Sequence, residues 1–199
     1  MPTSWTRAEG GVTRIIGGAA KGRRLATPPG DATRPTTDRV REALFSALEA
    51  QVGGLHGLRV LDLYAGSGAV GLEAASRGAA AVTAVESDRR TAALIVANAK
   101  TLGLEVVVVA QPVARALAGS PPAPYDVVFA DPPYPLEAAE VAEALAALVG
   151  NGWLSAGAAV VVERSARSVE PAWPAGLGVV RHKKYGETAL WYLRRADHE

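Results

Sequence analysis

The sequence predicts an α/β fold in which a mostly parallel sheet ends in an antiparallel hairpin. Short apolar runs alternate with helical patterns from residue 58 to residue 163, which is typical of parallel strands joined by crossover helices. Two longer β-rich runs follow with only a short turn between them, and such a pair forms an antiparallel hairpin. The residues before position 51 follow a different pattern and are expected to form a small extension.

This N-terminal extension is expected to span residues 12–50, after a disordered tail at residues 1–11 that has no periodicity. Two short β-rich runs flank a glycine-rich turn that carries Lys21, which predicts a hairpin with a basic tip. Thr36 or Thr37 can then cap a helix whose apolar residues recur at helical spacing.

The main domain, residues 51–199, is expected to contain seven strands, each an apolar run that ends at a turn signal. The predicted strands are residues 58–64, 81–85, 105–110, 127–130, 158–163, 177–184 and 188–194. Helices are expected between the first five of them, at residues 69–77, 88–102, 111–117 and 135–149. Pro135 suits the first turn of the last helix, where no backbone N–H is needed.

The composition excludes several kinds of site. The chain of 199 residues has no cysteine, which excludes disulfides, a cysteine nucleophile and thiolate-bound zinc. Its three histidines are scattered and predict no metal centre. No apolar run approaches the roughly 20 residues of a membrane helix, and no signal peptide is recognisable, so we expect a cytoplasmic protein without membrane or metal partners.

Charge is distributed unevenly along the chain. Residues 1–45 carry eight basic and four acidic residues, residues 46–165 carry seven and twelve, and residues 166–199 carry six and four. Two basic ends around an acidic middle are typical of a protein that grips a polyanion, such as a nucleic acid, around a central site. An unevenly charged, solvated surface is the alternative interpretation.

Polar residues lie near the end of several predicted strands or directly after them. Asp62, Glu86, Gln111 and Asp131 occupy such positions. Ligands of open α/β sheets bind at the carboxyl ends of the strands, so we expect these side chains to face one crevice.

The first strand leads into a segment that we call the glycine loop, residues 64–68. Gly66, Gly68 and Gly71 spell G-x-G-x-x-G, and Glu86 follows at the distance of a ribose-binding acid, so a nicotinamide oxidoreductase is one interpretation. Asp62 argues against it, because its charge would repel a pyrophosphate but attract an ammonium or a sulfonium. S-adenosylmethionine fits better, with its amino-acid end at the glycine loop and its ribose diol at Glu86. A tight turn without a ligand is the structural alternative.

The fourth strand runs into the tetrapeptide Asp131-Pro132-Pro133-Tyr134, in which the two prolines forbid a helix. The carboxylate of Asp131 and the carbonyl of Pro132 can each accept a hydrogen bond from one exocyclic NH2 group. The ring of Tyr134 can stack on the plane that carries this amine. The tetrapeptide therefore predicts group transfer to a planar amine, unless it is only a strand end followed by a proline turn.

Five runs of the sequence resemble the RsmD-type methyltransferases: RIIGGAAKGRRLATPPGDATRPTTDRVREALFSAL, VLDLYAGSGAVGLEAASRGA, VESDRR, FADPPY and KKYGETALWYL. The resemblance covers about residues 12–195, and the N-terminal run is its most specific part. It implies a Rossmann-like class I methyltransferase fold that uses S-adenosylmethionine. It also implies methyl transfer to N2 of one guanine in small-subunit (16S) ribosomal RNA, with a partly assembled subunit as the partner.

The resemblance implies roles for individual residues. The catalytic residues are those of the tetrapeptide, Asp131 to Tyr134. Cofactor binding is expected from Asp62, Tyr64, Ala65, Gly66, Ser67, Gly68, Glu86, Ser87, Gln111 and Pro112. Gln111 stands where many related enzymes carry an acid, and its amide oxygen can accept from the adenine amino group. RNA contacts are expected from Lys21, Arg23, Arg24, Arg34, Thr36, Arg39, Lys183 and Lys184.

Three alternatives remain from the residues alone. An adenine-N6 nucleic-acid methyltransferase shares the tetrapeptide but usually needs a recognition insert, and the 62 residues between Gly68 and Asp131 are consumed by sheet elements. A protein glutamine N5-methyltransferase normally has Asn in place of Asp131 and does not require basic ends. A non-catalytic RNA-binding assembly factor does not explain why Asp62, Glu86 and Asp131 all fall at strand ends.

Overall fold

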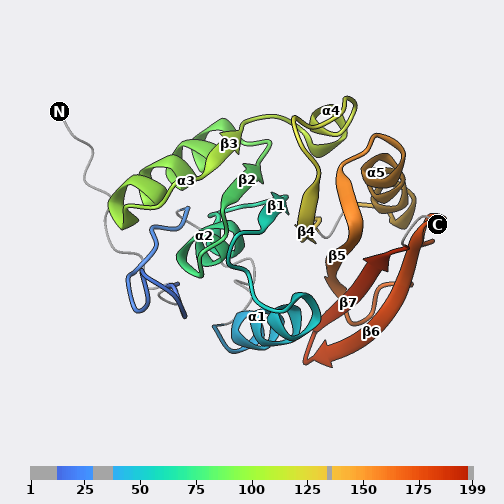
Figure 1. The fold of residues 1–199 in the computed structure, drawn as a ribbon, viewed down its shortest axis with the longest axis horizontal. Coiled ribbons are helices and arrows are strands. Elements are labelled where there is room, and N and C mark those ends of the chain that lie inside the picture. Colours follow the sequence, from blue (N-terminus) through green and yellow to red (C-terminus); the bar gives the residue numbers. More distant parts are fainter. Residues whose placement is uncertain (1–12, 29–37, 134–135, 197–199) are drawn as a thin grey trace.

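The computed structural model describes residues 13–28, 38–133 and 136–196 (Figure 1). Its helices are α1 (Asp38–Val52), α2 (Ala69–Ser76), α3 (Arg89–Leu102), α4 (Val113–Ala116) and α5 (Ala138–Gly150). Its strands are β1 (Arg59–Leu63), β2 (Ala81–Val85), β3 (Val107–Val109), β4 (Tyr125–Ala130), β5 (Leu154–Ser165), β6 (Leu177–Tyr185) and β7 (Thr188–Arg195).

The seven strands form one sheet in the order β3-β2-β1-β4-β5-β7-β6. The strands from β3 to β5 pair in parallel, whereas β7 pairs antiparallel with both β5 and β6. This arrangement confirms the predicted sheet, including the terminal hairpin. The order reverses between β1 and β4, and ligands bind at such a switch point in open α/β sheets.

Helices cover both faces of the sheet (Figure 1). On one face α4 and α5 pack on an apolar cluster that includes Leu61, Val128 and Leu145. On the other face α1 and α2 pack on a cluster that includes Phe45 and Phe129. Because the central strands are buried on both faces, their sequences are apolar runs rather than alternating patterns.

Several element boundaries differ from the prediction. Helix α5 begins at Ala138 rather than Pro135, because the side chains of Glu137 and Glu140 form a capping box that satisfies the first backbone N–H groups there. Strand β5 begins at Leu154, since Leu154 pairs with Tyr125 before an irregularity in the β4–β5 register. Strand β3 is limited to Val107–Val109.

The segment of residues 13–28, which we call the N-terminal hairpin, packs beside α2 and α3 (Figure 1). Its two arms are joined by one antiparallel bridge between Arg14 and Arg24, rather than by the longer predicted ladder. Backbone hydrogen bonds of 2.9 Å, from Ile15 N to Arg23 O and from Leu25 N to Thr13 O, flank this bridge. Buried side chains of the hairpin pack on apolar residues of α2 and α3 in a third cluster: Ile15, Ala20, Leu25, Leu72, Ala99 and Leu102.

Several predictions fall outside the described residues: the tail at residues 1–11, the helix cap at Thr36 or Thr37, Arg34, Tyr134 and the position of Pro135. None of the helices in the described part of the chain has the length and apolar character that crossing a membrane requires.

Candidate active site

The glycine loop joins β1 to α2 with a backbone that only certain residues adopt. Gly66 and Gly68 have φ angles of 53° and 78°, and Tyr64 also has a positive φ of 58°, which is unusual for a non-glycine residue. A Cβ atom on Gly68 would lie 2.8 Å from the Cγ2 atom of Ile95, so this position requires glycine for space as well. A Cβ atom on Gly66 would meet nothing within 4 Å, which leaves open space beside the loop.

Asp62 lies on β1 beneath this loop with only 2% of its surface exposed. Its Oδ2 atom accepts a hydrogen bond of 2.8 Å from the backbone N–H of Gly71 in the first turn of α2. Burial raises the pKa of Asp62 to about 7; the Gly71 hydrogen bond opposes the rise, and the charge of Glu86 adds to it. A buried carboxyl group with such a pKa is poised to ionise when a cation approaches, as at many ligand sites.

Glu86 follows β2 and connects three backbone segments. Its Oε2 atom accepts from Gly66 N at 2.8 Å, and its Oε1 atom accepts from Asp88 N at 2.8 Å. The backbone N–H of Glu86 donates to the carbonyl of Val109 at the end of β3. The carboxylate therefore holds the glycine loop against the end of β2, while two oxygens with about four lone-pair directions leave capacity for a ligand.

Asp131 and Pro132 follow β4, directly beside the end of β1. The register pairs Leu63 with Ala130, and the N–H of Asp131 donates to the carbonyl of Leu63 at 3.4 Å. Asp131 is half-buried and Pro132 is buried, whereas Pro133 is exposed. Because Leu63 also pairs with Val85, the ends of β4, β1 and β2 lie side by side. The predicted gathering of Asp62, Glu86 and Asp131 at one edge of the sheet therefore agrees with this topology.

The next strand end along this edge, that of β3, contributes Gln111 and Pro112. Gln111 is half-buried, and its N–H donates to the carbonyl of Val109. Pro112 is exposed and precedes the short helix α4, and Ser87, beside Glu86, is exposed as well. Because β3 is the neighbour of β2, these residues lie next to Glu86 at the same edge of the sheet. Among the described residues, no group of three or more potential metal ligands occurs.

The predicted RNA-binding residues divide between two parts of the molecule. Lys21 and Arg24 are exposed on the N-terminal hairpin, and Arg39 is exposed on α1. Lys183 and Lys184 are exposed on β6, where Lys183 pairs with Leu190 and through it with Glu163. Ala130 pairs with Val162, so the next residues, Asp131 and Glu163, stand at the same level across the sheet. Lys183 is therefore level with Asp131, three strand spacings or about 14 Å away.

Arg23 differs from the other predicted contacts because its guanidinium is engaged in the fold. It donates to the carbonyls of Thr101 and Leu102 at the end of α3, the second at 3.1 Å. Arginine in this position satisfies carbonyl groups that the helix leaves open. Arg23 therefore fixes the N-terminal hairpin to α3.

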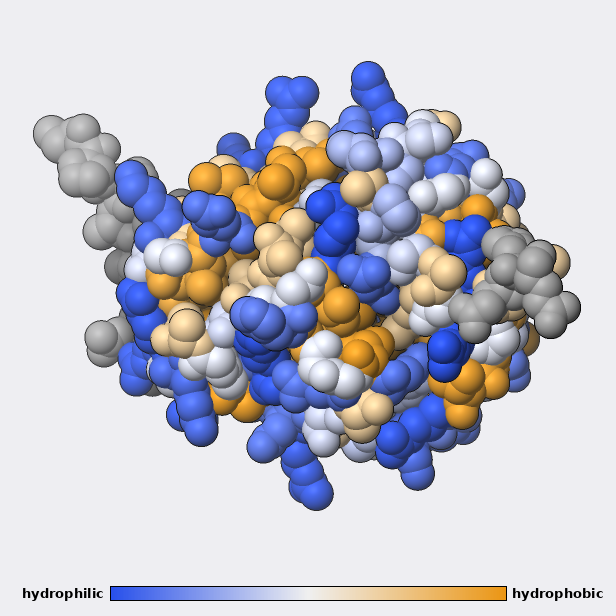
Figure 2. Space-filling view, in the orientation of Figure 1, coloured by the Kyte–Doolittle hydropathy of each residue, from blue (hydrophilic) through white to orange (hydrophobic). Residues whose placement is uncertain are grey.

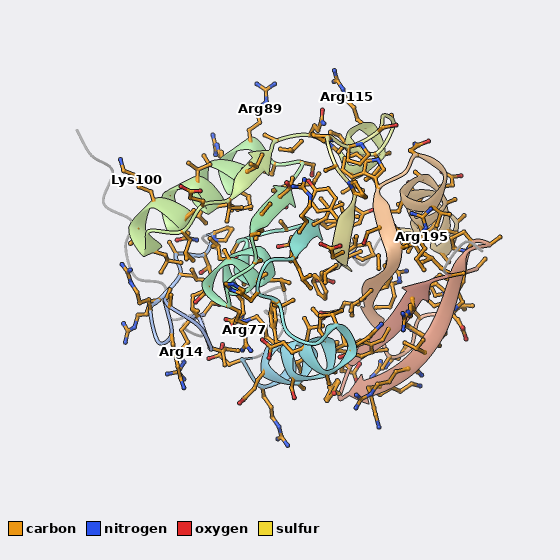
Figure 3. The ribbon with its side chains drawn as sticks, in the orientation of Figure 1. Arg14, Arg77, Arg89, Lys100, Arg115 and Arg195 are labelled. Atoms are coloured by element: carbon orange, nitrogen blue, oxygen red, sulfur yellow. The ribbon has the colours of Figure 1, made fainter. Side chains whose placement is uncertain are left out.

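Three buried polar residues that the sequence did not reveal join the N-terminal hairpin to the helices: Arg41, Glu73 and Asn98. Arg77, which is partly exposed, links Glu73 of α2 to Glu49 of α1. Burial lowers the pKa of Arg41, while the charges of Asp38 and Glu73 oppose this. Figure 3 shows Arg77 between α2 and α1, in contrast to Arg14, Arg89 and Arg115, which project outward. One signal was available: Asn98 follows Ile95 by three residues on the apolar face of α3, where a polar side chain needs a partner.

The order and directions of the seven strands are those of a fold that methyltransferases adopt. The same fold occurs in magnesium protoporphyrin IX methyltransferase from Synechocystis PCC 6803, solved with bound S-adenosylmethionine, with a TM-score of 0.63 and 15% identity over 79% of each chain. It also occurs in TrmN from Thermus thermophilus, with a TM-score of 0.63 and 23% identity over 82% of this chain and 51% of that one.

Closer relatives narrow this class to one family. A family model described as conserved hypothetical protein 95 matches residues 13–194. The chain is 38% identical over 190 residues to ribosomal RNA small subunit methyltransferase D of Escherichia coli (strain K12), covering 95% of this chain and 93% of that protein. The solved structure of yhhF from Escherichia coli has a TM-score of 0.83 and 36% identity, over 94% of this chain and 100% of that one. The chain belongs to the RsmD family, as its sequence motifs predict.

Proposed function

We propose that this protein transfers a methyl group from S-adenosylmethionine to the exocyclic N2 of one guanine in small-subunit (16S) ribosomal RNA, within a partly assembled subunit. The observation that carries this proposal is the similarity to the Escherichia coli methyltransferase, which extends through the N-terminal hairpin as well as the sheet. The arrangement of Asp62, Glu86 and Asp131 supports it with chemistry that suits a cationic donor and an amine acceptor.

The residues around the glycine loop fit the proposed cofactor. The ionised form of Asp62 would favour a positively charged ligand beside the loop, and the open space at Gly66 leaves room for its amino-acid end. Glu86 has lone pairs for a ribose diol, and Gln111 has an amide oxygen for an adenine amino group. The remaining proposed contacts come from neighbours of these groups: Tyr64, Ala65, Ser67, Gly68, Ser87 and Pro112. When bound, S-adenosylmethionine supplies an electrophilic methyl group.

The end of β4 would orient the acceptor amine. Guanine N2 is a poor nucleophile because its lone pair is delocalised into the ring. If Asp131 and the Pro132 carbonyl accept its two N–H groups, the lone pair is directed out of the ring plane, and orientation of this kind supplies several of the roughly 7 to 11 kcal/mol open to well-aligned reactants. Asp131 can also take up the proton that the amine loses. Stacking of Tyr134 on the base would contribute about 1 to 3 kcal/mol.

RNA would be bound through its shape and phosphates by exposed basic residues on both sides of β4. Lys21, Arg24 and Arg39 lie on the side of the N-terminal hairpin, and Lys183 and Lys184 lie on β6. Figure 2 shows that hydrophilic side chains project around the whole outline of the molecule. Arg34 and Thr36 belong to the proposed contacts through the family resemblance alone.

A pair of charge reversals tests the RNA-binding role of the hairpin. Lys21→Glu combined with Arg24→Glu should weaken RNA binding and lower the slope of log affinity against log salt by about 2, because two phosphate contacts are lost. Affinity for S-adenosylmethionine should stay unchanged. Arg23 is left intact, since it fixes the hairpin to α3. Reversal of Arg89 and Arg115, exposed cations elsewhere on the surface, is the matched control.

The reaction itself is tested by transfer of labelled methyl to 16S ribosomal RNA, naked and in partly assembled subunits, followed by mapping of the modified base. Label at N2 of a single guanine supports the proposal. Label at adenine N6, or on a protein glutamine, would overturn the substrate assignment while leaving the family unchanged.

A further inference from the structure

Glu73 is a carboxylate buried in the middle of α2, with none of its surface exposed. Its Oε2 atom accepts from Ile16 N at 2.7 Å, and its Oε1 atom accepts from Gly17 N at 2.7 Å. Oε1 also accepts from Arg77 Nε at 2.8 Å. A buried charge is costly unless hydrogen bonds and opposite charges compensate it, so these contacts bind two consecutive N–H groups of the N-terminal hairpin tightly to α2.

Ser76, one helical turn further along α2, holds the next part of the same hairpin. Its hydroxyl accepts from Ala20 N at 2.9 Å and donates to the carbonyl of Gly17 at 2.6 Å, and its carbonyl accepts from Ala19 N at 2.7 Å. The two backbones approach so closely that a Cβ atom on Gly18 would lie 1.8 Å from the Ser76 carbonyl oxygen. The hairpin turn therefore packs directly against the backbone of α2, where no movement of a side chain could make room for a Cβ atom at Gly18.

Two guanidinium groups balance the charge of Glu73, that of Arg41, which is buried, and that of Arg77, which is partly exposed. Arg77 bridges Glu73 to Glu49 of α1, with Nη1 at 3.2 Å from both Glu49 carboxylate oxygens. Arg41 of α1 lies with Nε at 4.0 Å from Glu73 Oε2, and it donates to the backbone carbonyl of Arg14 in the hairpin. The N-terminal hairpin, α1 and α2 therefore share one charge network.

Asn98 of α3 provides a second connection, and this one reaches the glycine loop. The side chain is 5% exposed. Its Oδ1 atom accepts from Ala26 N at 3.0 Å, and its Nδ2 atom donates to Ala26 O at 2.9 Å and to Ser67 O at 3.4 Å. One amide side chain thus contacts both the second arm of the hairpin and the backbone of the glycine loop.

We propose that Glu73 and Asn98 are positioning residues that fix the N-terminal hairpin relative to the glycine loop, and so set where bound RNA lies relative to the methyl donor. Helix α2 begins directly after Gly68, and Glu73 follows Gly68 by five residues, or about 8 Å of helix. The hairpin and the cofactor site are therefore held on the same short element. This inference rests on the RNA-binding role proposed for the hairpin.

The test compares Glu73→Gln and Asn98→Ala with the unchanged protein. Hydrogen exchange should accelerate at the amides of Ile16 and Gly17 in the first variant and at Ala26 in the second. In both variants the KM for partly assembled subunits should rise about tenfold, as expected for the loss of one or two buried hydrogen bonds. The Kd for S-adenosylmethionine should change less than about threefold in Glu73→Gln, because that side chain does not contact the glycine loop.

Matched controls are available on α5 and at its end. Glu143→Gln removes an exposed carboxylate, and Asn151→Ala removes a side chain that donates to Leu117 O at 2.7 Å, far along the chain from the hairpin. Both controls should leave hairpin exchange and KM unchanged. If Glu73→Gln does not fold, Ser76→Ala replaces it, since it removes two hydrogen bonds to the same turn.

Two results would overturn the inference, and they have different causes. Unchanged exchange at Ile16, Gly17 and Ala26 would show that these side chains do not hold the hairpin. Faster exchange with an unchanged KM would show that loosening the hairpin does not affect RNA binding, so the RNA-binding role proposed for the hairpin would be wrong.

Discussion

Replacing Asp62 by asparagine should stabilise the protein above neutral pH while weakening cofactor binding. The pKa of Asp62 rises from 3.8 to about 7 in the folded protein. Because the folded-state pKa is the higher one, the stability that the protonated group contributes is complete below about pH 4 and is lost as the pH rises through about 7. At pH 8 the buried charge therefore costs about 4 kcal/mol of the free energy of unfolding. Asp62→Asn has no charge to bury, and its amide oxygen can still accept from Gly71 N.

Urea unfolding of both proteins at pH 5 and pH 8 measures this effect. The stability advantage of Asp62→Asn should widen by about 2 to 3 kcal/mol between these values, because the two proteins share every other titrating group. Calorimetric titration with S-adenosylmethionine at pH 8 should show weaker binding to the variant, since the charge that attracts the cation is gone. A stability difference that does not change with pH would refute the assignment of this titration to Asp62. Such an exchange of stability for binding is common at functional sites.

Substitutions at two further positions, each with a comparison variant, test the candidate active site and the contact between the N-terminal hairpin and α2. Asp131→Ala should lower kcat about 10²-fold to 10³-fold with little change in cofactor Kd. Asp131→Asn keeps an acceptor oxygen and should lower kcat less. Equal losses of kcat in a methyl-transfer assay would favour base catalysis by Asp131 over orientation of the amine. Gly18→Ala should destabilise the protein by more than the roughly 1 to 2 kcal/mol that a non-glycine residue with a positive φ costs, because its Cβ atom would also meet the Ser76 carbonyl. Gly22→Ala is the control, since Gly22 has a similar φ of 80° and a Cβ atom there would meet nothing within 4 Å. Similar urea midpoints for the two variants would contradict this prediction.

The sheet and the ends of its strands could be predicted because local signals agree there with the global fold. Apolar runs that end in Gly, Asp or Pro mark strands buried on both faces, and β2 begins and ends at the predicted residues. Strands joined by crossover helices run parallel, so their carboxyl ends lie at one edge of the sheet. Asp62, Glu86 and Asp131 could be grouped without knowing any distance, because topology alone brings their strands side by side.

The attachment of the N-terminal hairpin could not be predicted, because it depends on pairs that are distant in sequence. Glu73 has the sequence neighbours of an apolar helix, and its partners Ile16 and Gly17 contribute only backbone N–H groups, which leave no mark on residue identity. Arg23 has the appearance of a phosphate contact in a basic run, yet its guanidinium binds the carbonyls at the end of α3. Charge in a sequence identifies a polar group but not whether its partner is inside or outside the protein.

The chemistry at the end of β4 cannot by itself select the base to be methylated. Asp131 and the Pro132 carbonyl are both acceptors, and the amino groups of guanine and adenine both offer two N–H donors. Under the proposed function, the position in which the RNA is held would supply this selection. The N-terminal hairpin is fixed to α2 and α3 on one side of β4, and Lys183 lies three strands away on the other. An RNA that contacts both sides must have the right shape across this span, so the fold of the RNA, rather than the edge of one base, would decide which amine reaches Asp131.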